Sequence, residues 1–191
     1  MPTAYRGPSN IASECLRQRP ECAMLIGLIA AEWSSVESML AQFCAFVIFG
    51  LREVSKQDLG EYIALDVMER TTSFQGKVVN LLRALEFRFG LDDPHYVEFG
   101  KRLKALERVQ KERNYVVHGR WALSDKHPKS LIWRGRVSHA EMEVYHESDF
   151  EAVLQKILKA EGNVSMYFGS KFQPRLQGPL KNRLGYTITM E

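Results

Sequence analysis

Three polar side chains that suit acid–base chemistry at a phosphate lie close together in this sequence: Arg113, Asn114 and His118. Histidine exchanges protons near neutral pH, and an arginine guanidinium stabilises the extra negative charge that a phosphate gains in its transition state. An asparagine amide can orient the phosphate or hold one imidazole tautomer. These residue types suit acid–base chemistry at a phosphate ester. Arg113, Asn114 and His118 are therefore the predicted catalytic residues.

The apolar residues around these side chains predict one core helix over about residues 93–118. They recur at helical spacing, and they are Phe99, Leu103, Leu106, Val109, Val116 and Val117. Asp92-Asp93-Pro94 supplies a cap and a proline for the first turn, and Gly119 suits a left-handed C-cap. Because Asn114 precedes His118 by one turn, the three polar side chains should converge near the C-terminal end of this helix.

The run Arg113-Asn114-Tyr115-Val116-Val117-His118 resembles the signature of the HEPN superfamily, an arginine, a polar residue, a short spacer and a histidine. The resemblance covers about residues 20–120. Members of this family look like small helical bundles that dimerise, and many look like metal-independent ribonucleases of defence and toxin–antitoxin systems. For this chain the resemblance implies a homodimer with Arg113 and His118 of each protomer in the cleft between the two. The implied products are a 2′,3′-cyclic phosphate and a 5′-hydroxyl, made without a cofactor or a metal. RNA and an antitoxin or other protein are the implied partners.

Other residues have supporting roles in this hypothesis. Tyr115 can stack on a base, and the basic residues Arg108, Lys111 and Arg120 can bind RNA. Glu37 has two interpretations. It is either an acid at the edge of the surface of the first long helix, or a carboxylate that forms a bidentate pair with the arginine of the signature and orients it.

An alternative hypothesis gives the signature a structural role in a non-catalytic helical dimerisation or interaction module. A cation at a helix C-terminus interacts favourably with the helix dipole, so His118 can serve as a cap. Arg113 is then a buried ion-pair partner and Asn114 a neighbour that only forms hydrogen bonds. The two hypotheses differ in whether Arg113 and His118 face an open basic cleft or are sealed in the core.

Composition indicates a soluble globular protein, and the sequence lacks the patterns of several common kinds of site. The chain has 191 residues, 45% of them hydrophobic, and a net charge of +3, which permits a nucleic-acid partner. Its three cysteines, Cys15, Cys22 and Cys44, have no metal-binding or disulfide pattern, which favours reduced thiols and a cytoplasmic location. The histidines lack metal-ligand spacing, and the sequence has neither a Gly-x-Ser-x-Gly turn nor a phosphate-binding Gly-rich loop. The apolar run Met24–Ala31 is too short to cross a membrane.

The predicted fold is mainly α, a HEPN-like antiparallel helical bundle with a small C-terminal antiparallel β appendage. Residues 1–20 are an N-terminal arm, 21–120 the bundle, 121–162 a small sheet plus a terminal helix, and 163–191 a basic tail. Helices are expected over about 11–18, 21–49, 59–68, 74–89 and 150–160, the last closed by Gly162. Short strands are expected over 121–123, 131–137 and 141–145.

Overall fold

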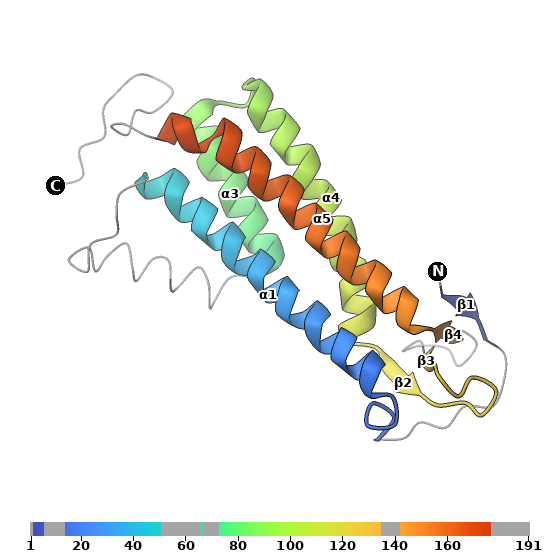
Figure 1. Cartoon of the computed structure of the whole chain (residues 1–191). Helices are drawn as coiled ribbons and strands as arrows, with labels where there is room; N and C mark the ends of the chain where they lie inside the picture. The colour runs from blue at the N-terminus through green and yellow to red at the C-terminus, as the bar shows by residue number, and fades with distance from the viewer. Residues whose placement is uncertain (1, 6–13, 51–65, 67–72, 135–141, 177–191) are drawn as a thin grey trace. The chain divides into compact units, whose positions relative to one another are not determined.

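A computed structural model describes residues 2–5, 14–50, 66, 73–134 and 142–176 of the chain. Four long helices dominate these residues, namely α1 (Pro20–Phe49), α3 (Phe74–Phe89), α4 (Pro94–Val117) and α5 (Glu147–Lys171) (Figure 1). Four short strands accompany them: β1 (Thr3–Ala4), β2 (Arg120–Ala122), β3 (Leu131–Arg134) and β4 (Met142–Tyr145). A 3-10 turn, η1 (Gln173–Leu176), follows α5. The protein is therefore mainly helical with a small antiparallel sheet, as predicted.

The chain divides into two compact units whose boundaries fall inside the long helices. Unit 1 comprises Met1–Trp33 and Glu107–Lys159, and unit 2 comprises Ser34–Leu106 and Ala160–Glu191. Unit 1 holds the sheet, the start of α1, the end of α4 and the start of α5. Unit 2 holds the end of α1, α3, the start of α4 and the end of α5.

The sheet of unit 1 has the strand order β1-β4-β3-β2, with every pair antiparallel. Alternation along the strands gives it two different faces. One face buries an apolar cluster of Tyr5, Ala122, Ile132 and Val144. The other presents Trp121 and Tyr145, which contact Phe150 of α5 at ring-centroid distances of 5.3 and 5.4 Å. Aromatic packing therefore holds α5 against this second face.

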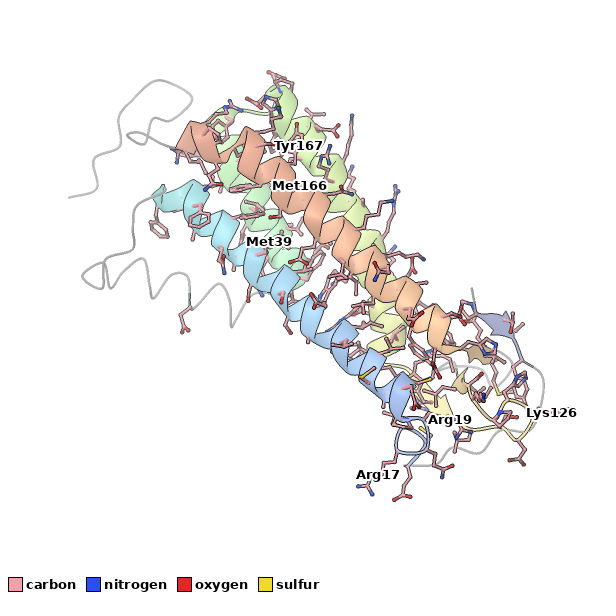
Figure 2. The ribbon with its side chains drawn as sticks, in the orientation of Figure 1. Arg17, Arg19, Met39, Lys126, Met166 and Tyr167 are labelled. Atoms are coloured by element: carbon pink, nitrogen blue, oxygen red, sulfur yellow. The ribbon has the colours of Figure 1, made fainter. Side chains whose placement is uncertain are left out.

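Unit 2 is built around aromatic side chains from the end of α5. Phe168 stacks on Phe43 of α1 with ring centroids 3.9 Å apart, and it lies 5.8 Å from Phe172. Its neighbour Tyr167, labelled with Met166 in Figure 2, accepts the guanidinium of Arg102 over its ring at 4.4 Å. These contacts show why the chain remains helical and ordered here.

Several predicted helix ends are confirmed. Ser73 caps α3 by accepting a hydrogen bond from the amide of Gly76 at 3.2 Å, and Gly90 ends that helix with φ +90°. Gly50 follows α1 with φ +83°. Asp93 caps α4 and accepts the amide of His95 at 2.9 Å. Residues 14–18 of the helix predicted over 11–18 form a turn and not an α-helix, so this prediction is wrong there. Residues 11–13, and all of the helix predicted over 59–68 except Asp66, lie outside the described residues.

The predictions of where the last helix ends and where the tail begins are both wrong. The sequence predicts the last helix over about 150–160, but α5 spans Glu147–Lys171, so Gly162 does not close it and no extended tail begins at residue 163. Asp149 lies in its first turn, where its carboxylate accepts the amide of His146 at 2.9 Å. The N-terminal arm contributes β1, which pairs with β4. Residues 177–191 of the predicted tail lie outside the described part of the chain.

Two further features bear on the environment of the chain. By length and composition alone, α1 as a whole is apolar enough to cross a membrane, although core helices of soluble proteins pass the same test. The expectation drawn from the short run Met24–Ala31 therefore does not extend to the whole helix. All three cysteines are buried and free, and burial raises the pKa of Cys44 to about 11, which keeps that thiol protonated.

Because the residues beyond Gly162 are helical and packed, Phe168→Ala should strongly lower the stability of the fold. Phe168 is 1% exposed, so removing its ring should lower the free energy of unfolding by about 3–5 kcal/mol. Met166→Ala is the matched control on the same turn of α5, since Met166 is 69% exposed and should change stability by less than about 0.5 kcal/mol. Urea denaturation of both variants measures the difference. Equal free energies of unfolding for the two variants would contradict this packing.

The pair of Asp93 with Arg175 predicts acid-sensitive stability. Arg175 donates to both carboxylate oxygens of Asp93, at 3.3 and 2.6 Å, and these bonds are the main cause that holds the pKa of Asp93 below its ordinary value. The stabilisation is therefore present above the ordinary aspartate pKa, about 3.9, and is lost as pH falls below it.

Asp93→Asn keeps a good helix cap but removes the charge, so it should cost about 1–2 kcal/mol at pH 7 and less at pH 3. Asp92→Asn is the control, because Asp92 is the neighbouring residue and is exposed. It should have little effect on stability at either pH. Urea unfolding of the three proteins at both pH values tests this. The same loss for Asp93→Asn at pH 3 as at pH 7 would refute it.

Candidate functional site

The three predicted catalytic side chains do meet at the end of α4. Nη1 of Arg113 donates to Oδ1 of Asn114 at 3.0 Å and lies 3.4 Å from Nε2 of His118. The cause is local: the chain is helical to Val117, and the amide of His118 still donates to the carbonyl of Asn114 at 3.0 Å. Residues 114 and 118 are therefore one turn apart on one face, with the guanidinium between their polar atoms.

This cluster is open to solvent rather than sealed in the core. Asn114 and His118 are exposed, and Arg113 is partly buried. The buried part of Arg113 lies against Trp33 of α1, whose ring centroid is 5.9 Å from the guanidinium carbon. Cation–π contact with an indole holds a guanidinium in place. Arg113 is thus anchored against α1 beside the exposed Asn114 and His118.

The contact between Arg113 and His118 suits one tautomer of the imidazole. A guanidinium only donates, so this contact is a hydrogen bond only when Nε2 of His118 is the acceptor and the ring proton lies on Nδ1. A histidine with a lone pair on Nε2 can accept a proton from a hydroxyl. The cluster therefore combines a proton acceptor, a fixed positive charge and an amide within one helical turn.

Two tryptophans of the sheet hold the end of α4 that presents the cluster. Nε1 of Trp133 donates to the carbonyl of Tyr115 at 3.1 Å, and Nε1 of Trp121 donates to the carbonyl of Val116 at 3.3 Å. Carbonyls in the last turn of a helix have no partner within the helix, so these indoles supply one. Trp121 and Trp133 are cross-strand partners in β2 and β3. No local pattern in the sequence marks these two tryptophans for this role, because each contact joins a strand to the end of a helix.

Gly119 is required by space and not by backbone conformation. The prediction of a left-handed C-cap is wrong, because among the described glycines only Gly50 and Gly90 have positive φ. A Cβ on Gly119 would instead lie 2.7 Å from Cδ1 of Trp133 and 2.7 Å from the carbonyl oxygen of Tyr115. The missing side chain lets the Trp133 indole reach the helix end.

The predicted RNA-binding side chains are accessible. Tyr115 is 54% exposed, and its ring lies 5.2 Å from that of Trp133. The basic residues Arg108, Lys111 and Arg120 are also exposed. An exposed tyrosine and three exposed cations are the residue types that contact bases and phosphates in RNA complexes.

Glu37 belongs to unit 2 and pairs with Lys77. Nζ of Lys77 donates to Oε2 of Glu37 at 3.2 Å, and the lysine side chain is only 4% exposed. A buried ammonium needs such a partner, because leaving it unpaired costs several kcal/mol, roughly. The sequence analysis did not anticipate this pair, since Lys77 lies among the apolar positions of α3 and no local pattern marks it as buried.

The histidines of the described residues take part in separate contacts. Nδ1 of His146 lies 2.7 Å from Oγ of Ser130, and Nδ1 of His95 lies 3.1 Å from the hydroxyl of Tyr167. Over residues 2–5, 14–50, 66, 73–134 and 142–176, no group of three histidine, cysteine or acidic residues is arranged to hold a metal ion. The cluster of Arg113, Asn114 and His118 is therefore the candidate functional site.

Searches of protein-family models, of curated proteins and of solved structures find no match to this chain.

The close approach at Gly119 predicts that Gly119→Ala destabilises the protein. The added methyl group must push the Trp133 indole away from the helix end, at a cost of about 1–3 kcal/mol in the free energy of unfolding. Gly100→Ala on the same helix is the control, since nothing lies within 4 Å of its Cβ position. Alanine favours a helix over glycine, so Gly100→Ala should stabilise by about 0.5–1 kcal/mol. Thermal denaturation that gave both variants the same sign would contradict this account.

Proposed function

We propose that this protein is a metal-independent endoribonuclease or RNA-binding protein of the HEPN type, acting in the cytoplasm in a defence or toxin–antitoxin system. The observation that supports it best is the contact of Arg113 with both Asn114 and His118 on an accessible helix end. The proposal also rests on the resemblance of residues 113–118 to the HEPN signature.

The cluster suits cleavage by the 2′-hydroxyl of RNA. Nε2 of His118 accepts the proton of this hydroxyl as its oxygen forms a bond to phosphorus. The guanidinium of Arg113 has five N–H donors, so it can keep its contact with Asn114 while it binds the non-bridging phosphate oxygens. The bond from phosphorus to the 5′-oxygen then breaks, and that oxygen takes a proton from water. The products are a 2′,3′-cyclic phosphate and a 5′-hydroxyl.

A homodimer is part of the proposal, and the outer side of α1 in unit 1 supports it. Met24 is 60% exposed and Leu28 42% exposed, one turn apart, with the exposed small residues Gly27 and Ala31 beside them. Apolar side chains at this spacing, next to small residues, suit a second helix. An antitoxin or other protein partner is the remaining possibility for this surface.

A non-catalytic interaction module is the second candidate function. The contact of Arg113 with the buried Trp33 ring and the position of His118 at a helix C-terminus favour it. The exposure of His118 and Asn114 favours the enzyme, since a purely structural pair gains more from burial. Activity and stability of single variants separate the two.

The proposal predicts that RNA cleavage in EDTA is lost in His118→Ala and Arg113→Ala. Each variant should cut a labelled RNA hairpin at least about 100-fold more slowly than wild type, because one lacks the proton acceptor and the other the charge on the phosphate. The same RNA with 2′-O-methyl groups should resist wild type, since the attacking hydroxyl is blocked. Arg17→Ala removes an arginine whose side chain is 83% exposed (Figure 2) and should cut normally.

Circular dichroism and light scattering accompany the assay to report folding and mass. Wild type that leaves the hairpin intact, together with variants that melt several degrees lower, would favour the structural module. Cleavage of the 2′-O-methyl RNA would reject attack by the 2′-hydroxyl.

A further inference from the structure

Unit 1 contains a cavity of about 310 Å³ whose lining includes none of the three proposed catalytic residues. Its walls come from the sheet and from the sides of α4 and α5, and include the rings of Tyr115 and Tyr145. All residues that line it belong to unit 1. A cavity of this volume accepts a metabolite or a long side chain.

The cavity is strongly acidic. Glu112, Glu143 and Asp149 contribute three carboxylates, and Lys156 is the one cation among the lining residues. That lysine is occupied, because its Nζ donates to Oε2 of Glu112 at 2.6 Å. The carboxylate of Glu143, in contrast, has no hydrogen-bond or ion-pair partner within the described residues. The site therefore attracts positive charge and repels phosphate.

The side chain of a buried tyrosine also lines this cavity. Tyr145 is 7% exposed, and its hydroxyl has no hydrogen-bond partner in the part of the chain that the structure describes. Burial, and then the nearby carboxylates of Glu143, Asp149 and Glu112, raise the pKa of Tyr145 to about 12. The phenol therefore stays neutral at physiological pH. Its hydroxyl is available for a hydrogen bond with a ligand in the cavity.

The acids of the cavity are not grouped like the ligands of a metal ion. Among the described residues no three acidic, histidine or cysteine side chains are close enough to hold one. The carboxylate of Glu143 and the hydroxyl of Tyr145 suit a cation with several separate N–H donors, and a planar guanidinium is such a cation. The tyrosine rings add favourable surfaces, since guanidinium groups stack on aromatic faces.

We propose that this cavity binds a guanidinium cation, with Glu143 as its carboxylate partner and Tyr115 and Tyr145 as its aromatic walls. The guanidinium comes either from a free small molecule or from an arginine side chain of a protein partner. The proposal does not depend on ribonuclease activity.

Calorimetric titration of the full chain tests this with two pairs of probes. N-acetyl-arginine amide is compared with N-acetyl-citrulline amide, a neutral molecule of nearly the same shape. Agmatine is compared with a short peptide that contains one arginine, to distinguish a free cation from a side chain. The arginine compound should bind wild type at least about tenfold more tightly than the citrulline compound, because charge-assisted hydrogen bonds are lost in the latter.

Matched variants test whether the ligand binds in this cavity. Glu143→Gln should weaken binding about tenfold or more, and Tyr145→Phe should weaken it by a smaller factor. Glu151→Gln removes the same charge from an exposed position on α5 outside the cavity, and it should bind like wild type. Melting curves confirm that each variant is folded.

Equal binding of the arginine and citrulline compounds by wild type, or no binding of any guanidinium probe, would overturn the proposal without reference to any variant. Unchanged affinity in folded Glu143→Gln would also overturn it. Preferential binding of a nucleoside that Glu143→Gln abolishes would replace it with a base-recognition site.

Discussion

The candidate site depends on how the end of α4 is fixed against the sheet. A helix terminus has carbonyl groups without partners and tends to fray. Here the indoles of Trp121 and Trp133 donate to two of these carbonyls, each bond contributing about 1 kcal/mol. Gly119 makes this possible because it leaves space for the Trp133 ring. Without this attachment, Arg113, Asn114 and His118 would lie on a mobile helix end.

The same region of unit 1 presents two kinds of electrostatic environment. The Arg113 cluster is cationic and open, whereas the cavity beside Tyr145 is acidic and walled by aromatic rings. Tyr115 lies in the helix between Arg113 and His118 and also lines the cavity. Helical geometry explains this, since residues 112 and 115 share one side of α4 while 114 and 118 share another. One helix end can therefore serve an anionic ligand and a cationic ligand.

Sequence patterns were reliable where local physical chemistry decides the structure. Asp93 caps α4 as predicted and Ser73 caps α3, because helix N-caps depend on neighbouring residues alone. Gly50 and Gly90 end α1 and α3 with positive φ, whereas the left-handed cap predicted at Gly119 is wrong, because the Trp133 indole and not the local backbone requires that glycine. Patterns failed at α5, where Gly162 suggested an end to the helix. Phe168 packs against Phe172 and also against Phe43, which is far away in sequence. This packing outweighs the low helix propensity of one glycine.

The sequence by itself determined the mainly helical class, the antiparallel strands and the convergence of Arg113, Asn114 and His118, since all three follow from helical or strand periodicity. Only the tertiary structure decided the partner of Glu37, the indole contacts at the helix end and the existence of the acidic cavity. Each of these joins residues that are distant in the chain. How close these residues come in space depends on packing between elements, which no local pattern encodes.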